Sequence, residues 1–365
     1  MISIILVNYK TNDQLLDAVA SVLTQITADP LEVIVVDNSP ADTAYTSLAA
    51  QLPHNVTYIQ NNKNIGFAKA CNQAFDYSNG EFILLLNPDA RLLPSALSKL
   101  TESLKQHPDA GAVGPRVYWD DDCRFLMPPS TYPSIASFYK EAISRLHPLM
   151  SQYSSIDFRK KALQAWTCNT LVPVEALSGG HILIRREAIL KCGGLFDPRF
   201  FMYWEDTDLM HRLKKAGYRL YLEPEAKCLH YYTHAHTKDH LIAQGWSIFQ
   251  LKHFRHNKRF RFVNWINKQL PPAATPDIMP ITVKYEKLIF PVPSELQHAW
   301  LLELGTSPQL IPAIGHFGSG PTAEVDTALF QRLQDKIYFA RLSEPVSRPD
   351  LIYYWQWQGY PSKTY

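Results

Sequence analysis

Four short runs of apolar residues recur through the first 90 residues of the chain, each bounded by polar residues. Uninterrupted runs of this kind are typical of strands that are buried on both faces of a sheet. The segments between them have helical periodicity, and strand–helix alternation predicts a parallel, doubly wound sheet. The expected strands are residues 2–7, 31–36, 56–59 and 82–86, and the expected helices are residues 12–24, 41–52 and 66–77.

Polar side chains follow each of these expected strands. In open α/β sheets, ligands bind beyond the carboxyl ends of the strands, so this edge of the sheet is the expected binding site. The polar residues at the four strand ends are Asn8-Tyr9, Asp37-Asn38, Gln60-Asn61-Asn62 and Asn87-Pro88-Asp89.

The middle of the chain has a weaker pattern. Residues 119–170 are irregular and predict a long loop, which in a compact domain is usually functional or mobile. Strands are expected again at residues 181–184 and 218–222, and between them an acidic motif opens an expected helix. Residues 238–270 have a helical pattern and precede a Pro-rich linker at 271–276.

The tail differs in character from the rest of the chain. Residues 277–365 alternate short β-prone runs with Pro, Gly and Ser turns, which predicts a separate β-sandwich-like domain. Aromatic residues alternate along this tail, which predicts that they form its hydrophobic core. The alternative is that they form an exposed face on which sugars stack. These aromatic residues are Tyr338, Tyr353, Tyr354, Trp355, Trp357 and Tyr360.

Composition and charge narrow the class of protein. The 365 residues are 46% hydrophobic and 19% charged, as in an ordinary globular protein. A net charge of +2 argues against nucleic acid as a partner. The five cysteines have no metal-finger spacing and fit reduced thiols, and residues 2–7 are too short for a signal core. We therefore expect a cytoplasmic protein.

The acidic motif has two interpretations. Glu205, Asp206 and Asp208 follow an aromatic run, and acids at a helix start are stabilised by its free N–H groups. Alternatively, a carboxylate against an aromatic wall is tuned for proton abstraction, as a general base.

Other polar residues at the sheet edge indicate a nucleotide and a cation. Asp37 ends the second strand, where an acid can accept hydrogen bonds from a nucleoside, while the absence of a GxGxxG motif argues against a dinucleotide cofactor. Asp89 is a candidate ligand for Mg²⁺ or Mn²⁺. His230 is the favoured second ligand over His234 and His236.

Taken together and in order, these motifs resemble the inverting family 2 glycosyltransferases of the GT-A fold, and within them the bacterial rhamnosyltransferase-like branch. The resemblance covers roughly residues 1–236, so a transferase domain is expected at 1–237 and an accessory domain at 277–365. The motifs that carry it are Val7-Asn8-Tyr9-Lys10-Thr11, Val36-Asp37-Asn38-Ser39, Asn64-Ile65-Gly66-Phe67-Ala68 with Asn72, Leu86-Asn87-Pro88-Asp89-Ala90, Ser178-Gly179-Gly180 and Phe201-Met202-Tyr203-Trp204-Glu205-Asp206-Thr207-Asp208-Leu209.

The resemblance implies a role for individual residues. Asp206 would deprotonate an acceptor hydroxyl and Glu205 would orient it, while Asp89 and His230 would hold the metal. Trp204, Gly179 and Gly180 would contact the acceptor. The nucleotide-sugar site would be lined by Asn8, Tyr9, Asp37, Asn64, Gly66, Phe67, Asn72 and Asn87.

The implied activity is metal-dependent transfer of a sugar from a nucleotide-sugar, with L-rhamnose from dTDP-rhamnose favoured, to a bacterial surface glycan or lipid-linked oligosaccharide. A UDP-hexose or UDP-N-acetylhexosamine donor is the first alternative. A non-catalytic glycan-binding protein on the same scaffold is the second. A nucleotidyltransferase is disfavoured because no glycine-rich, Arg-containing loop follows the first strand.

A basic and aromatic segment lies at residues 246–268, and no acid occurs from 240 to 270. One interpretation is a solvated helix that packs on the catalytic domain. The other is peripheral contact with anionic lipid at the inner face of the cytoplasmic membrane, where a lipid-diphosphate acceptor would be found.

Overall fold

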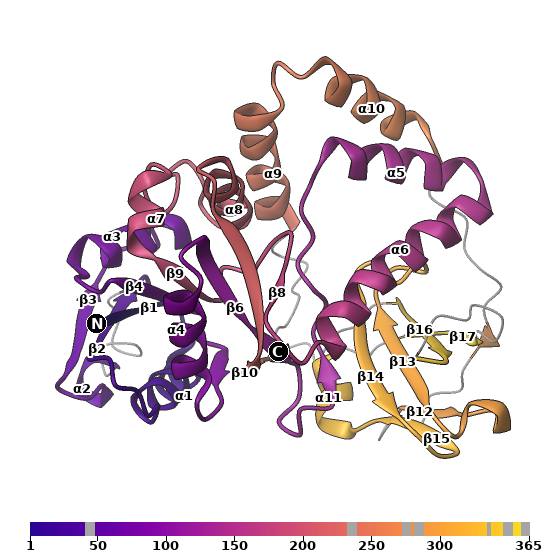
Figure 1. Ribbon diagram of the computed structural model, residues 1–365, viewed down its shortest axis with the longest axis horizontal. Coiled ribbons are helices and arrows are strands. Elements are labelled where there is room, and N and C mark those ends of the chain that lie inside the picture. The colour runs from indigo at the N-terminus through magenta and orange to yellow at the C-terminus, as the bar shows by residue number, and fades with distance from the viewer. Residues whose placement is uncertain are drawn as a thin grey trace.

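The computed structural model confirms the predicted fold class, a mostly parallel sheet between helices with extra C-terminal strands (Figure 1). It describes residues 1–40, 48–231, 239–271, 279–280, 288–333, 337–345 and 353–358. The parallel strands lie in the order β3-β2-β1-β4. They are β1 (Ile2–Asn8), β2 (Leu31–Asp37), β3 (Val56–Gln60) and β4 (Phe82–Leu86).

Helices cover both faces of this sheet. The apolar faces of α1 (Asn12–Leu23), α2 (Leu48–Gln51) and α4 (Ala96–Gln106) pack on one side. On the other side are α3 (Phe67–Tyr77), α7 (Arg186–Lys191) and α8 (Glu205–Lys215). Part of the helix expected at 41–52 lies outside the described residues. β3 is only half-buried because it pairs with β2 on one side alone.

One strand is much longer than its apolar run predicts. The strand expected at 218–222 is β10 (Arg219–His230). It runs parallel to β6 (Ala110–Tyr118), with a register shift between Glu223 and Lys227, and then antiparallel to β5 (Ala90–Leu92). β8 (Val172–Pro173) also pairs with it, and β9 (His181–Arg185) inserts antiparallel between β4 and β6.

The prediction of a long loop at residues 119–170 is wrong for most of that range. A short strand, β7 (Phe125–Leu126), is followed by two helices, α5 (Ile135–Leu146) and α6 (Pro148–Thr167). The Pro/Ser/Tyr stretch before them is irregular as expected, and Ser134 closes it with a capping box to Ser137. The sequence does not show a clear helical pattern for α6, because buried polar residues interrupt the apolar face of this helix.

The C-terminal strands extend the sheet and bury an aromatic core. β14 (Ile314–Gly318) pairs with β7, and β12 (Leu288–Pro291) with β15 (Thr322–Val325) forms a small second sheet packed on it. Tyr338, Trp355 and Trp357 are buried, which confirms the core interpretation for them; Tyr360 lies outside the described residues. The other elements are β11 (Met279–Pro280), β13 (Trp300–Gly305), α11 (Thr327–Arg332), β16 (Ile337–Ser343) and β17 (Tyr353–Gln358).

A buried ion-pair network joins α6 to these strands. Glu303, on β13, is fully buried and binds Arg341 on β16 through contacts of 2.6 and 2.7 Å. Arg159 of α6 donates to the same carboxylate. Because a buried charge without a partner is strongly unfavourable, these three residues fix α6 against the C-terminal strands. Whether residues 277–365 form an independent domain stays a prediction.

The basic and aromatic segment forms α9 (Asp239–His253) and α10 (Lys258–Gln269). Phe249, Phe254 and Phe260 are buried in the core shared with the transferase sheet, so this part of the segment packs on the protein. Among the described residues, no helix combines the length and apolar character needed to cross a bilayer. The linker expected at 271–276 falls almost entirely outside the described residues.

Candidate active site

The ends of β1 and β2 are joined by a buried polar network around Asp37. Its Oδ1 accepts from Asn8 Nδ2 at 3.1 Å and from the Ser39 backbone N–H at 2.8 Å, and its Oδ2 accepts from the Tyr58 hydroxyl at 3.0 Å. Asp37 and Asn8 have no exposed surface, whereas Tyr9 is 45% exposed. Both buried residues therefore shape this edge from beneath, and nucleoside contact by Asp37 stays a prediction.

A second group of predicted residues holds the loop before α8. Gly66 has a φ of 89° and lies so close to Phe201 that an added Cβ would be 2.7 Å from its carbonyl oxygen. Asn64 Oδ1 accepts from the Gly66 N–H at 2.9 Å, and the Phe67 N–H donates to the Phe201 carbonyl at 2.7 Å. Asn72 pairs its side-chain amide with both backbone groups of Phe196, at 2.8 and 2.9 Å. These residues thus position the loop 196–201.

Asp206 lies against the glycine pair Gly179-Gly180. Its Oδ2 accepts from the Gly179 N–H at 3.1 Å, and an added Cβ on Gly179 would be 2.9 Å from its Cβ. The next residue, Gly180, accepts from the Asn87 N–H at 2.8 Å. The glycines are therefore needed for close approach, and they connect Asp206 to the end of β4.

Glu205 differs from its neighbour in burial. It is 5% exposed, and its Oε2 has no hydrogen-bond partner among the described residues. Burial, with the nearby Asp206 charge as a second cause, raises the pKa of Glu205 well above its ordinary value. The adjacent carboxyls are thus differentiated by their surroundings, with Glu205 favouring the protonated form.

Replacing Glu205 by glutamine tests this protonation state. In wild-type protein the raised pKa means that stability falls as pH rises above the ordinary glutamate value of 4.5, because only the unfolded chain ionises freely. We expect the variant to gain stability relative to wild type with increasing pH, measured by urea unfolding from pH 4 to 8. The same change at exposed Glu187 is the control. A difference independent of pH would contradict the assignment.

The backbone before Glu205 is strained. Tyr203 and Trp204 both have positive φ values, 70° and 71°, which cost about 1–3 kcal/mol each for non-glycine residues. The Trp204 ring packs on Trp246 of α9, with centroids 4.6 Å apart, and Gly245 passes close to the Tyr203 carbonyl. α9 therefore stabilises the turn that presents the acids, and acceptor contact by Trp204 stays a prediction.

The two predicted metal ligands are brought together by strand pairing. β5 follows the turn at Asp89 and pairs with β10 so that Ala90 is opposite His230. His230 Nε2 lies 3.3 Å from Asp89 Oδ1. Next to it, His181 has a pKa lowered to about 3 by burial and by His230.

One carboxylate and one imidazole fit a divalent cation whose remaining ligands come from phosphate and water, as is common for Mg²⁺. In the part of the chain that the structure describes, no three His, Cys, Asp or Glu side chains gather into a metal-binding group. The protein would thus supply two ligands here. His234 and His236 lie outside the described residues.

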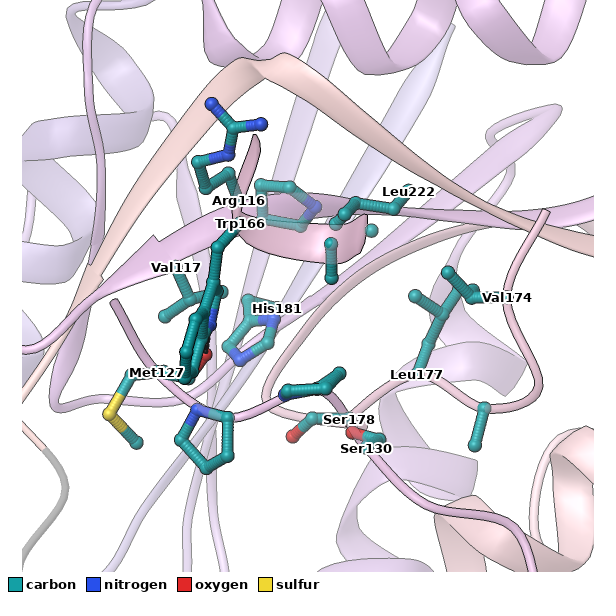
Figure 2. A pocket seen from close by; sticks show the side chains of 16 residues that line it. Arg116, Val117, Met127, Ser130, Trp166, Val174, Leu177, Ser178, His181 and Leu222 are labelled. Atoms are coloured by element: carbon teal, nitrogen blue, oxygen red, sulfur yellow. Dashed lines mark hydrogen bonds between the residues drawn. The ribbon is translucent and has the colours of Figure 1, made fainter. Parts of the chain in front are cut away.

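A cleft lies next to both halves of the site (Figure 2). His181 lies near its middle, with Trp166 on one side and Leu177 on the other. Ser178, which also lines it, precedes the glycine that binds Asp206. No acidic side chain contributes to its walls. They are formed by Gly114, Pro115, Arg116, Val117, Met127, Pro128, Pro129, Ser130, Ala165, Trp166, Val174, Ala176, Leu177, Ser178, His181 and Leu222.

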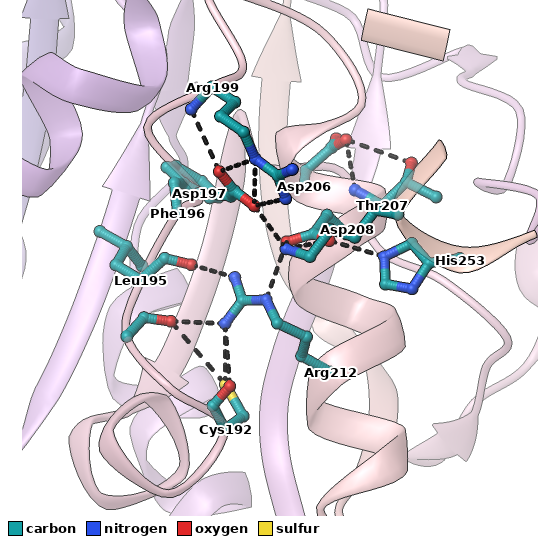
Figure 3. A network of polar contacts seen from close by, with 12 residues as sticks. Cys192, Leu195, Phe196, Asp197, Arg199, Asp206, Thr207, Asp208, Arg212 and His253 are labelled. Atoms are coloured by element: carbon teal, nitrogen blue, oxygen red, sulfur yellow. Dashed lines mark hydrogen bonds and ion pairs between the residues drawn. The ribbon is translucent and has the colours of Figure 1, made fainter. Parts of the chain in front are cut away.

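Asp208 is the centre of a buried network that the sequence pattern did not distinguish from the other acids (Figure 3). It has no exposed surface and binds Arg212 at 2.8 Å, Lys252 at 2.8 Å and His253 at 2.7 Å. Burial opposes its charge, but the hydrogen bonds from His253 and Lys252 outweigh it and lower the pKa of Asp208 to about 2. The network joins α8 to α9.

The same network reaches the loop before the acids. Arg212 donates to the carbonyls of Gly194 and Leu195 at 2.6 and 2.5 Å, and Lys252 also binds Asp197 at 2.7 Å. Lys252 belongs to the basic segment for which the sequence left a solvated helix and lipid contact as alternatives. In the structure its amine instead binds two carboxylates inside the protein. Lys252 and Asp208 are too far apart in the sequence for any local spacing to indicate that they pair.

Comparison with known proteins decides the family. Residues 3–189 match the family described as Glycosyl transferase family 2, which is more than half of the chain. The chain belongs to this family. The match covers the sheet from β1 to β9 and ends before the acidic motif.

Relatives of this glycosyltransferase include rhamnosyltransferases. It is 28% identical over 280 residues to an N-acetylglucosaminyl-diphospho-decaprenol L-rhamnosyltransferase of Mycobacterium tuberculosis, covering 72% of this chain and 87% of the relative. A 61-residue segment is 39% identical to rhamnosyltransferase WbbL of Escherichia coli K12, covering 17% of this chain and 23% of the relative. The predicted rhamnosyltransferase-like membership is confirmed.

A solved structure is also similar to this glycosyltransferase. The mannosyltransferase PcManGT from Pyrobaculum calidifontis, in complex with GDP-Man and Mn²⁺, aligns with 73% of this chain and 68% of its own. The TM-score is 0.46 and the sequence identity is 19%.

Proposed function

We propose that this enzyme transfers L-rhamnose from dTDP-rhamnose, with inversion, to a hydroxyl of a growing bacterial surface glycan. The observation that carries the proposal is a cleft whose lining residues reach both candidate groups: Ser178 precedes the glycine that donates to Asp206, and the His181 ring contacts His230 of the Asp89–His230 pair. An acceptor in this cleft would have a candidate base at one end and the candidate diphosphate site at the other. The rhamnosyltransferase relatives support the choice of sugar.

In the proposed reaction the acceptor oxygen attacks the anomeric carbon as the bond to the nucleoside diphosphate breaks. Asp206 takes the hydroxyl proton, since it is partly exposed and held by the Gly179 N–H. The neighbouring Glu205 is buried, and burial raises the pKa of its carboxyl, which disfavours a second negative charge beside the base. Asp89 and His230 would hold Mg²⁺ or Mn²⁺, which when bound neutralises charge on the leaving diphosphate.

The acceptor is proposed to be lipid-linked. Apolar and aromatic side chains dominate the cleft, and its one charged side chain, Arg116, is a cation. This composition suits a sugar with apolar faces near an anionic diphosphate. Such an acceptor is confined to a bilayer, so the proposal includes peripheral contact with anionic lipid at the inner face of the cytoplasmic membrane.

Calorimetric titration with dTDP and UDP, each with and without Mn²⁺, tests the donor. We expect metal-dependent binding that favours dTDP, because the proposed donor carries that nucleotide. Preference for UDP would keep the enzyme class but replace the donor with a UDP-hexose or UDP-N-acetylhexosamine. Binding of neither nucleotide would contradict the proposal and favour a non-catalytic glycan-binding role.

A further inference from the structure

The corner between α5 and α6 exposes a group of large apolar side chains. Each is between 44% and 64% exposed, and they recur at three- and four-residue intervals along the two helices. Within each helix this is the spacing of one face, with Ile143 and Leu146 on α5 and Leu149, Met150 and Tyr153 on α6. We call this group the α5–α6 corner; it consists of Ile143, Leu146, Leu149, Met150 and Tyr153.

The neighbouring helix α10 exposes two aromatic rings among basic residues. Phe262 and Trp265 are 57% and 60% exposed, and their rings stack with centroids 6.5 Å apart. The opposite face of α10 is buried through Phe260, Val263 and Asn267. The helix carries four cations and no acid, and within the described residues none of these cations has an ion pair; they are Lys258, Arg259, Arg261 and Lys268.

Both groups belong to one helical layer at the rim of the molecule. α5 and α10 lie side by side at the upper right of Figure 1, above α6 and the C-terminal strands. Phe138 of α5 contacts Phe260 of α10, with centroids 5.0 Å apart, and Arg145 donates to the Asn267 carbonyl at 3.0 Å. The layer is therefore fixed by its buried seam, while the apolar side chains of the α5–α6 corner and the two rings of α10 stay exposed.

We propose that the α5–α6 corner and the outer face of α10 together bind the surface of an anionic lipid bilayer. The inference rests on the proposed membrane contact and assigns that contact to residues that are not among those proposed to bind the donor or the acceptor. Apolar and aromatic side chains on such a surface bury themselves at the headgroup boundary, while nearby Lys and Arg are attracted by anionic lipid. The unpaired cations of α10 favour an anionic bilayer over a second copy of this chain, which would present the same positive charge.

The test is sedimentation of the full chain with vesicles of phosphatidylcholine alone or with one third phosphatidylglycerol. We expect wild-type protein to bind the anionic vesicles at least tenfold more tightly than the neutral ones. Leu146→Ser/Leu149→Ser should weaken binding to anionic vesicles at least tenfold. The matched control, Ile26→Ser/Leu190→Ser, removes two apolar side chains elsewhere that are 88% and 61% exposed, and it should leave binding unchanged.

The outcomes separate this inference from the proposed function. Equal loss in both double variants, or no loss in either, would overturn the assignment to the α5–α6 corner while leaving membrane contact in place. No binding of wild type to either vesicle would overturn both the surface and the membrane contact. A concentration-dependent dimer abolished by Leu146→Ser/Leu149→Ser, in light scattering without lipid, would assign the surface to self-association instead. Donor titration is unaffected by any of these results, so failure there contradicts the proposed reaction alone.

Discussion

Replacing Asp206 by asparagine is expected to lower the rate of sugar transfer by about 10²–10⁴-fold, the usual contribution of a general base. Asparagine has the same shape, and its amide oxygen can still accept from the Gly179 N–H, which lies 3.1 Å from Oδ2. The side chain keeps this bond but loses the one that Oδ1 accepts from the Thr207 N–H at 2.6 Å, and it cannot take the acceptor proton. The measurements are the transfer rate and, on the same protein, donor binding by calorimetry, which should not change.

A matched change at exposed Asp76, on α3, controls for the loss of one negative charge and should leave both quantities unaltered. If the Asp206 variant transferred sugar at the wild-type rate, Asp206 would not be the base. Weakened donor binding with normal turnover would instead place Asp206 in the donor site.

Replacing Asp208 by alanine is expected to destabilise the fold by about 3–5 kcal/mol, the usual effect of removing one partner from a buried ion pair. The change leaves Arg212, Lys252 and His253 around an empty position where a buried carboxylate bound all three. Because the pKa of Asp208 is lowered to about 2, this stabilisation is present at neutral pH and is lost as pH falls below about 4. Urea unfolding at pH 7 and pH 3 measures both effects.

The exposed pair between Asp17 and Arg91 provides the comparison, since alanine at Asp17 removes a surface ion pair that contributes little. A similarly small loss for Asp208 would show that α8 and α9 are held together by their apolar contacts alone. Equal destabilisation of the variant at pH 7 and pH 3 would contradict the role given to the Asp208 charge.

The sheet and the strand-end residues could be predicted because the controlling pattern is local. The apolar runs of β1 and β4 match the observed strands to within one residue, and the helix that begins at Glu205 starts where the acids predict it. Parallel strands necessarily bring their carboxyl ends to one edge. Asp37, Asn87 and Asp89 therefore reach the same side of the sheet without any need to know the tertiary contacts.

What could not be predicted depends on contacts between distant segments. Nothing in the sequence near Asp208 distinguishes it from Asp206. Only the docking of α9 buries Asp208, whereas Asp206 stays partly exposed against Gly179. The cleft itself joins residues from 114 to 222, and Trp166 belongs to a helix whose apolar face is interrupted by buried polar residues. Neither feature has a local period that a sequence pattern can reveal.

The contact between Trp166 and Gly315 has a consequence for how sequences of this kind can diverge. A Cβ at position 315 would lie 2.5 Å from the indole ring, which lines the cleft on its other side. The two positions are therefore constrained jointly: a larger residue at 315 requires a smaller one at 166. Among sequences that retain both α6 and the C-terminal strands, glycine at 315 and tryptophan at 166 should be inherited together and lost together. A substitution at 315 would then change the shape of the cleft that we propose for the acceptor, without any change in the residues proposed for catalysis.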